Sequence, residues 1–302
     1  KMVRGRTWAV QIEEDFPRLP VAEFLGAHLP ILMATAQAVA FAHSRGVVHR
    51  DLKPSQVMTG EFGEVLLMDW GLAMAFGEGK ETTPFARVIP GRESASSPAG
   101  TPVFMAPEQT RNDASGVGPW TDVFLLGGIL YLLLTGRPPH DAPTSIAAMK
   151  MAEDCAVPLP TARAQGREVP QELERICLKA LAKEPSKRHE SAGALLAELR
   201  DYVSGASRRR QAEELARTAS QRLEEAASSY LVLGEAISLA SQARTLWAEC
   251  MSARWAEVRG LAMYAEAALR KGDLGLARVQ AERLPDTPER ASLSARIDSA
   301  EA

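Results

Sequence analysis

The sequence is poor in cysteine and carries little net charge. Its 302 residues include three cysteines, Cys155, Cys177 and Cys250, which lie far apart and lack Cys-x-x-Cys spacing. An odd, scattered set argues against a disulfide framework or a zinc site and favours a reducing, cytoplasmic setting. The 35 basic and 38 acidic residues give a formal net charge of −3, so we expect no nucleic-acid partner from charge alone.

Long apolar runs are also missing. The longest covers residues 123–134 and contains Gly127 and Gly128, whereas a membrane-spanning helix needs roughly 20 apolar residues. We therefore predict a buried core helix there and no membrane segment in this chain. The hydrophobic content of 46% and charged content of 24% are those of ordinary globular proteins and exclude a disordered chain.

Proline is nearly absent from the last third of the chain. Of the 19 prolines, all but Pro285 and Pro288 precede residue 205, and the remaining segment is rich in alanine, glutamate and arginine. This change in composition predicts a domain boundary near residues 204–210, with a first domain over 1–204 and a helical region over 205–302.

Hydrophobic spacing in the first domain predicts a mostly helical fold with a small β component. Expected helices cover residues 30–44, 121–135, 142–153, 171–183 and 191–203. Short apolar runs at 47–48, 56–59 and 64–68 predict strands, and the turn at 60–63 joins the last two as a hairpin. Residues 70–99 show no sustained period and are expected to form a long functional loop.

A polar loop between these strands has the composition of a phosphoryl-transfer site. It reads His49-Arg50-Asp51-Leu52-Lys53-Pro54-Ser55-Gln56. In this spacing an aspartate accepts the proton of a substrate hydroxyl, and a side-chain amide further along holds a metal ion. Asp51 is therefore the candidate base, and Gln56 is the candidate amide ligand.

Two further motifs follow in order. Asp69-Trp70-Gly71 comes directly after the strand at 64–68, where a carboxylate can bind a Mg²⁺ ion that bridges phosphate oxygens. The segment Gly100-Thr101-Pro102-Val103-Phe104-Met105-Ala106-Pro107-Glu108 precedes Asp122, which stands at the head of an apolar helix. Asp69 is the candidate metal ligand.

Together these motifs make residues 1–204 resemble the C-terminal lobe of a bacterial, eukaryotic-type serine/threonine protein kinase. The resemblance implies an enzyme that transfers the γ-phosphoryl group of ATP to serine or threonine hydroxyls of a protein substrate, with ATP and Mg²⁺ as cofactors. It implies that Lys53 contacts the transferred phosphoryl group, that Thr101 braces Asp51 and Lys53, and that Met58 faces the adenine.

The same resemblance assigns supporting roles to other residues. Glu108 resembles the acid that pairs with a buried arginine late in the lobe, for which Arg188 is the candidate. Asp122 resembles the aspartate that binds the backbone of the catalytic loop. Arg50 is the feature of kinases whose activation loop is ordered by phosphorylation. His49, Trp70 and Gly71 are expected to pack around the metal loop and perform no chemistry.

Two departures from the family pattern are visible. Gln56 stands where the family has asparagine, and its extra methylene must be absorbed before the amide oxygen reaches a metal ion. Nothing before residue 47 resembles the glycine-rich loop, the strand lysine or the helix glutamate of the ATP-covering small lobe. We expect these residues alone to hold ATP weakly, and a catalytically silent, kinase-like binding or scaffolding protein is the competing interpretation.

The region after residue 204 is predicted to be helical. Leucines recur with alanines between them at Leu215, Leu223, Leu231, Leu239 and Leu246, which favours an amphipathic helical array or a bent coiled coil. Residues 272–277 resemble the turn of one tetratricopeptide-like helical hairpin. Such helices could bind a protein partner, and a plain helical packing extension is the equally open alternative.

Overall fold

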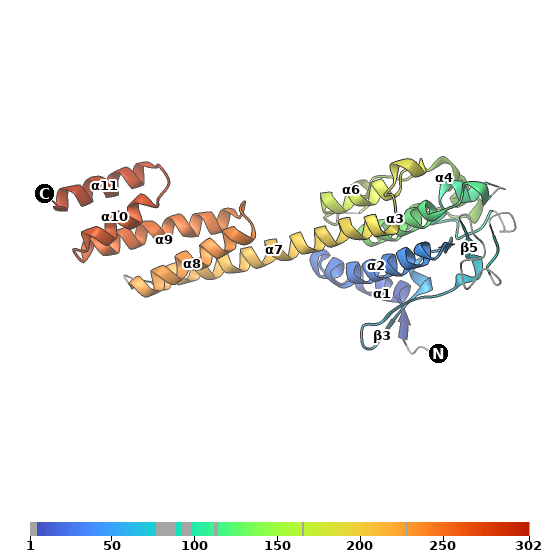
Figure 1. Cartoon of the computed structure of the whole chain (residues 1–302), viewed down its shortest axis with the longest axis horizontal. Coiled ribbons are helices and arrows are strands. Elements are labelled where there is room, and N and C mark those ends of the chain that lie inside the picture. The colour runs from blue at the N-terminus through green and yellow to red at the C-terminus, as the bar shows by residue number, and fades with distance from the viewer. Residues whose placement is uncertain are drawn as a thin grey trace. The chain divides into compact units, whose positions relative to one another are not determined.

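The computed structural model describes residues 5–76, 89–91, 98–111, 114–164, 166–226 and 229–301. It is mostly helical, with 67% helix and 5% strand, which confirms the predicted fold class. Contacts between Cα atoms divide the chain into two compact units, residues 1–202 and 203–302 (Figure 1). Within the predicted long loop, residues 77–88 and 92–97 lie outside the described residues.

The first unit contains most of the helices. Its α-helices are α1 Trp8–Asp15, α2 Val21–Ser44, α3 Pro119–Thr135, α4 Ser145–Asp154, α5 Pro160–Arg163, α6 Gln171–Ala180 and the beginning of α7 Ala192–Glu225. Its 3-10 turns are η1 Pro54–Gln56, η2 Trp70–Leu72, η3 Pro107–Thr110, η4 Ala114–Gly116 and η5 Pro185–Lys187. The helices predicted at 121–135, 142–153 and 171–183 are confirmed, with ends that differ by no more than three residues.

Helix α2 begins earlier than predicted. The expected start at Pro30 is wrong, because Pro30 lies inside a helix that begins at Val21. Buried residues on both sides of the proline, including Phe24, Leu29 and Leu32, pack into the unit and offset the roughly 3 kcal/mol that an internal proline costs. By length and composition alone this helix would also be long and apolar enough to cross a membrane, although 44% of its most apolar window is buried in the fold.

Five short strands position the polar loops. Strands β1 Gly5–Thr7, β3 Val57–Gly60 and β4 Val65–Leu67 form an antiparallel sheet in the order β1-β3-β4, and the predicted hairpin is confirmed as the β3–β4 pair. Strand β2 Val47–Val48 pairs with β5 Met74–Ala75. The predicted loop after residue 70 therefore contains a 3-10 turn and a short strand at its start.

Helix α3 is the centre of the first unit. Nearly all of its residues are buried, which confirms the predicted core helix. Two glycines allow its neighbours to approach closely. A Cβ atom at Gly127 would lie 2.6 Å from the Cβ of Ala180 on α6, and one at Gly128 would lie 3.3 Å from the ring of Phe104. The apolar run thus forms a helix that other elements cover on all sides.

A buried ion pair ties the end of the first unit to its middle. The Arg188 guanidinium donates to both carboxylate oxygens of Glu108, at 2.7 and 2.8 Å. It also donates to the backbone carbonyls of Trp120, Ala182 and Lys183. Both charged groups are almost fully buried, so each depends on the other for its solvation.

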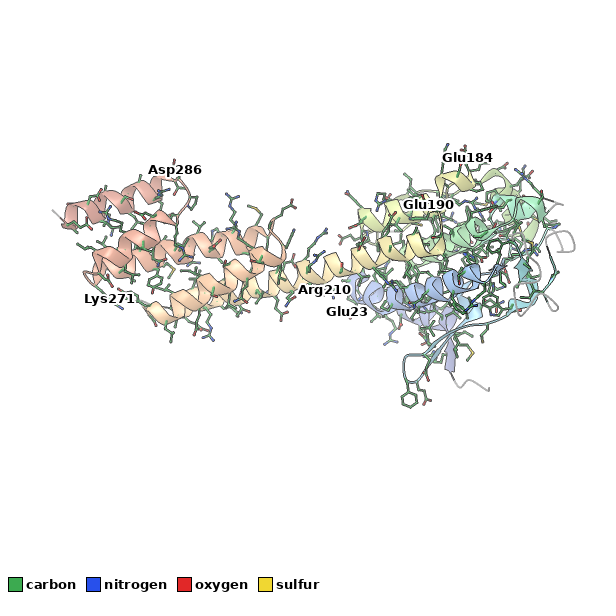
Figure 2. All side chains as sticks on the ribbon, in the orientation of Figure 1. Glu23, Glu184, Glu190, Arg210, Lys271 and Asp286 are labelled. Atoms are coloured by element: carbon green, nitrogen blue, oxygen red, sulfur yellow. The ribbon has the colours of Figure 1, made fainter. Side chains whose placement is uncertain are left out.

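The second unit is a run of packed helices. They are the rest of α7, then α8 Tyr230–Leu246, α9 Met251–Arg270, α10 Leu274–Glu282 and α11 Pro288–Glu301. Helix α9 contacts α8, α10 and α11. Figure 2 places Asp286 at the turn between α10 and α11. The predicted turn near Gly272 is confirmed: Gly272 has φ of +74°, and the Asp273 carboxylate accepts from the backbone N–H of Leu276 at 3.2 Å.

One prediction for this region is wrong in detail. The helix expected to end at residue 203 continues to Glu225, so residues 204–210 are helical. Gly205 does not interrupt it because the flanking alanine, arginine and glutamine residues are strong helix formers. The leucines fall on several helices of a packed array, and they are not all buried: Leu223 is buried, whereas Leu231 is 73% exposed.

We predict that Arg188→Met destabilises the first unit by about 3–5 kcal/mol, because it leaves the Glu108 carboxylate buried without its partner. The free energy of unfolding is measured by hydrogen–deuterium exchange of the α3 amides in the whole chain, which reports the first unit alone. The neighbouring variant Lys187→Met is the control. Its ion pair with Glu184 is exposed on both sides, so we expect a change within about 0.5 kcal/mol. Equal effects of the two variants would contradict the assignment.

We also predict that the first unit loses stability as the pH falls below about 6.5. His140 is fully buried, stacks on Phe124 and contacts the Met105 carbonyl at 3.1 Å. Burial lowers its pKa from 6.5 to about 4, so the unfolded chain takes up the proton first. The stabilisation is complete above pH 6.5 and decreases toward pH 4, by roughly 2 kcal/mol at pH 5. Exchange measured from pH 7.5 to 5 should show a smaller decrease for His140→Gln, and the same decrease in both proteins would refute the prediction.

Candidate functional site

One buried carboxylate holds the polar loop in place. Asp122, in the first turn of α3, accepts from the backbone N–H groups of His49 and Arg50, both at 2.8 Å, and from His43 Nε2 at 2.8 Å. Arg50 has φ of +74°, a left-handed conformation that is strained for a non-glycine residue. These bonds hold the strained turn, and the turn directs the following residue, Asp51, away from β2.

The next residues form a closed polar triangle. Lys53 Nζ lies 2.9 Å from Asp51 Oδ2 and donates to Thr101 Oγ1 at 2.6 Å. The Thr101 hydroxyl in turn donates to Asp51 Oδ1 at 2.6 Å. Asp51 and Lys53 keep 12% and 22% of their side chains exposed, so a substrate can reach them. The structure thus brings together the three residues predicted to act on the transferred group.

A second carboxylate lies at the end of the same loop. The Gln56 side-chain amide donates to Asp69 Oδ2 at 2.9 Å, and the backbone N–H of Met68 donates to the Gln56 carbonyl at 2.8 Å. Asp69 has φ of +58°, and its other oxygen accepts from the Gly71 N–H. This places the two candidate metal ligands side by side, with Gln56 at the end of the turn η1 that follows Asp51 and Lys53.

The donor set fits Mg²⁺ shared with phosphate groups. Asp69 offers carboxylate oxygens and Gln56 an amide oxygen, the hard donors that Mg²⁺ prefers. No group of three or more His, Cys, Asp or Glu residues suited to a metal ion occurs in the part of the chain that the structure describes. This is compatible with Mg²⁺, which commonly binds one or two carboxylates and completes its shell with phosphates and water. Gln56 currently presents its NH₂ group to Asp69, so its amide must turn before the oxygen can bind a metal ion.

His49 is buried beneath these residues, and Trp70 lies against it while 38% exposed. The His49 ring contacts the Met68 carbonyl through Nε2 at 3.1 Å and the Asp51 backbone N–H through Nδ1 at 3.3 Å. The Trp70 ring lies 4.6 Å from the imidazole. Because both ring nitrogens face the backbone, His49 has a structural position and no access to a substrate. Met58, the residue expected to face adenine, is half-buried on β3 opposite Thr7 and Leu66.

Arg50 is buried beside the loop. Its guanidinium donates to the Leu72 carbonyl at 3.3 Å. Burial lowers its pKa, and the nearby Asp122 carboxylate opposes this shift. The predicted role of Arg50 requires a phosphorylated activation loop. Most of the predicted long loop, residues 77–88 and 92–97, lies outside the described residues. The predicted partners Glu108 and Arg188 meet away from this cluster, as a buried structural pair.

Sequence reasoning missed Gln109. Its buried amide nitrogen donates to the carbonyls of Arg50 at 2.7 Å and Ala99 at 2.9 Å, and its oxygen accepts from the Ala106 N–H at 3.0 Å. Gly100 has φ of +130°, and a Cβ there would lie 3.0 Å from this amide. Gln109 therefore joins the polar loop, residues 49–56, to the segment that carries Thr101. The available signal was an amide directly after Glu108, at the end of the apolar, proline-containing stretch 102–107.

Comparison with known proteins agrees with this geometry. Residues 28–198 match the protein kinase domain family. The chain is 37% identical over 179 residues to the serine/threonine-protein kinase PknB of Mycobacterium leprae, which covers 59% of this chain and 26% of that protein. It is 33% identical over 195 residues to the serine/threonine-protein kinase PknD of Protochlamydia amoebophila, covering 61% and 20% respectively.

The match therefore spans about a quarter or less of the length of these relatives. The family match nevertheless covers more than half of this chain, from within α2 to the beginning of α7. It includes Asp51, Lys53, Asp69 and Thr101. The chain belongs to the protein kinase family.

Proposed function

We propose that this chain forms the catalytic and substrate-binding lobe of a serine/threonine protein kinase that transfers the γ-phosphoryl group of ATP to a protein hydroxyl. The observation that carries the proposal is the triangle of Asp51, Lys53 and Thr101. A carboxylate, an ammonium and a hydroxyl in mutual contact at a partly exposed position suit a reaction in which a proton leaves one oxygen while a phosphoryl group arrives.

Asp51, Lys53 and Thr101 have different roles in the proposed reaction. Asp51 orients the substrate hydroxyl and accepts its proton while the hydroxyl oxygen bonds to the γ-phosphorus of ATP. The bond from that phosphorus to the β–γ bridging oxygen breaks at the same time, and ADP leaves. Lys53 neutralises charge on the transferred phosphoryl oxygens. Thr101 holds one oxygen of Asp51, so that the second oxygen, after Lys53 shifts toward phosphate, remains directed at the incoming hydroxyl.

Asp69 and Gln56 are the residues that would hold Mg²⁺. Bound by these residues, Mg²⁺ would supply positive charge that offsets the negative charge developing on the phosphate during transfer. Asp69 is held in place by the Gly71 N–H and lies two residues after the end of β4. Gln56 contributes through an amide that currently donates to the same carboxylate.

A catalytically silent binding protein is the second candidate. The contact between Gln56 and Asp69 favours it, because the amide hydrogen bond occupies a carboxylate oxygen that a metal ion would need. Breaking such a charge-assisted bond costs more than breaking a neutral one. The two candidates differ in one measurable property, namely whether phosphate transfer occurs when the nucleotide is properly covered.

We predict that Asp51→Asn lowers phosphate transfer by roughly 100- to 10,000-fold, because the proton acceptor is lost while the backbone bonds to Asp122 remain. The assay uses a chain that carries residues 1–302 behind a nucleotide-covering segment with a glycine-rich loop and a strand lysine. Radiolabelled phosphate incorporated into a generic basic protein is the readout. Asp286→Asn, at an exposed turn of the second unit, is the control. Activity of Asp51→Asn within twofold of the parent would exclude Asp51 as the base, and an inactive parent would favour the silent protein.

We further predict that Gln56→Asn lowers the Mg²⁺ concentration needed for half-maximal nucleotide binding by several-fold. The shorter side chain cannot span the 2.9 Å bond to Asp69 in the same geometry, and its oxygen then reaches the metal without absorbing an extra methylene. Calorimetric titration of Mg²⁺ at fixed ATP measures this midpoint in residues 1–302 joined to the same nucleotide-covering segment. Gln171→Asn, on the exposed start of α6, is the matched control. An unchanged midpoint would show that Gln56 already coordinates well.

A further inference from the structure

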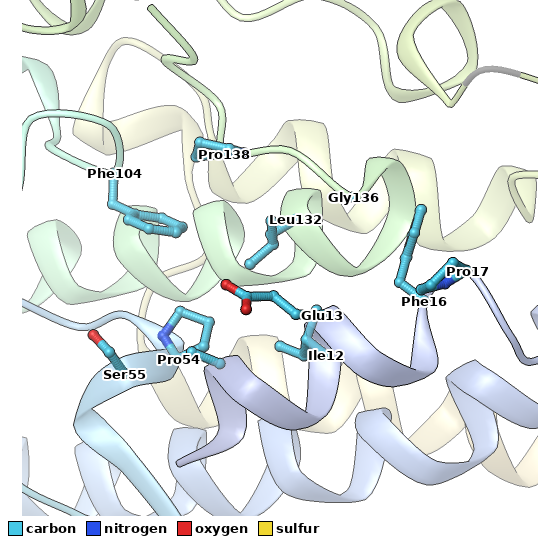
Figure 3. Close-up of a pocket in the computed structure, with 11 residues that line it drawn as sticks. Ile12, Glu13, Phe16, Pro17, Pro54, Ser55, Phe104, Leu132, Gly136 and Pro138 are labelled. Atoms are coloured by element: carbon cyan, nitrogen blue, oxygen red, sulfur yellow. The ribbon is translucent and has the colours of Figure 1, made fainter. Parts of the chain in front are cut away.

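A cavity of about 450 Å³ opens beside the catalytic loop. It lies between α1, the turn η1, the C-terminal end of α3 and the segment before η3, and Figure 3 shows the side chains around it. Its walls are mainly apolar, from Ile12, Phe16, Pro54, Phe104 and Leu132. Glu13 is the one charged residue among those that line it.

The cavity is continuous with the reacting groups through the backbone. Pro54 directly follows Lys53, and the next lining residue, Ser55, precedes Gln56. On the opposite wall the backbone N–H of Phe104 donates to the Thr101 carbonyl at 2.9 Å. A polypeptide that presents a hydroxyl to Asp51 therefore places residues close to that hydroxyl at the mouth of this cavity.

The walls are fixed before any ligand arrives. Gly136 has φ of +72°, and a Cβ there would overlap the Phe16 ring at 2.5 Å, so glycine lets Phe16 close one end. The Arg167 guanidinium lies 4.2 Å from the centre of that ring and donates to the Phe16 carbonyl. Gly128 likewise leaves room for Phe104. A preformed apolar cavity binds a side chain without the cost of ordering its own walls.

Glu13 gives the cavity a second property. It has no hydrogen-bond or ion-pair partner within the described part of the chain, whereas the adjacent Glu14 pairs with Arg6. In Figure 3 the Glu13 carboxylate points toward the centre of the group formed by Pro54, Phe104 and Leu132. An unpaired carboxylate at the rim of an apolar cavity favours a ligand that combines an apolar group with a nearby positive charge.

We propose that this cavity selects protein substrates by accepting a large apolar side chain close to the phosphorylated serine or threonine, with an adjacent lysine or arginine directed to Glu13. The inference rests on the proposed kinase function and names its substrate class. The occupant is the substrate polypeptide, because the cavity walls begin at the residues next to Lys53 and Thr101.

A peptide library tests the preference. It is phosphorylated by residues 1–302 joined to the nucleotide-covering segment described above. Each peptide contains one central serine or threonine, and every flanking position is varied in turn. We expect leucine, methionine or phenylalanine at one flanking position to raise phosphorylation about tenfold or more over glycine or aspartate. A basic residue next to it should add a further several-fold. Equal phosphorylation of all flanking sequences, or a preference for acidic residues, would overturn the proposal.

Variants assign the preference to the cavity. Leu132→Glu should replace the apolar preference at that position by a basic one, and Leu132→Ala should shift it toward larger side chains. Glu13→Gln should remove the basic preference, while the control Glu14→Gln leaves it unchanged. Thermal unfolding verifies that each variant is folded, and Leu132→Ala provides the milder change if the glutamate is not tolerated. Preferences that persist in all three cavity variants would show that they arise elsewhere.

Peptide binding separates this inference from the kinase assignment. Fluorescence anisotropy of a library peptide with leucine and arginine beside its serine, mixed with residues 1–302, requires no phosphate transfer. Binding that weakens at least tenfold in Leu132→Glu supports the cavity as a peptide site even if no peptide is phosphorylated, which would refute the enzyme alone. Phosphorylation without any dependence on Leu132 or Glu13 would refute the cavity's role alone.

Discussion

The site depends on one buried carboxylate at the start of one helix. Asp122 accepts two backbone N–H groups of the catalytic loop, and these bonds hold Arg50 in a left-handed conformation that its side chain disfavours. A buried carboxylate is stable only when its oxygens are fully bonded, so the loop and the helix each satisfy a requirement of the other. The direction of Asp51, and through it the contact with Thr101, follows from this arrangement.

Much of the site could be predicted because its residues are close in sequence. Asp51, Lys53 and Gln56 lie on one short loop, and Asp69 follows a strand whose apolar pattern is readable. Their chemistry is a property of residue type and spacing, which is visible without coordinates. The pairing of β3 with β4 is equally local, since a glycine turn joins the two strands.

Other features depend on tertiary contacts and were therefore hidden. The start of α2 at Val21 could not be read from Pro30, because the buried side chains that support the helix are recognisable only in the packed unit. Gln109 joins backbone carbonyls that lie 59 and 10 residues away, a relation that no local pattern reports. The length of α7 was underestimated because a change in composition near residue 204 is not a break in the helix.

Helix α3 carries both the loop anchor and one wall of the cavity. Asp122 stands in its first turn and Leu132 near its end, about 15 Å apart at 1.5 Å per residue. The helix is almost entirely buried, and a close-packed interior transmits displacements because it leaves few voids. We therefore expect the polar loop and the cavity wall to move together with α3. The distance between a side chain seated against Leu132 and the carboxylate of Asp51 would then stay nearly constant while the surrounding fold fluctuates.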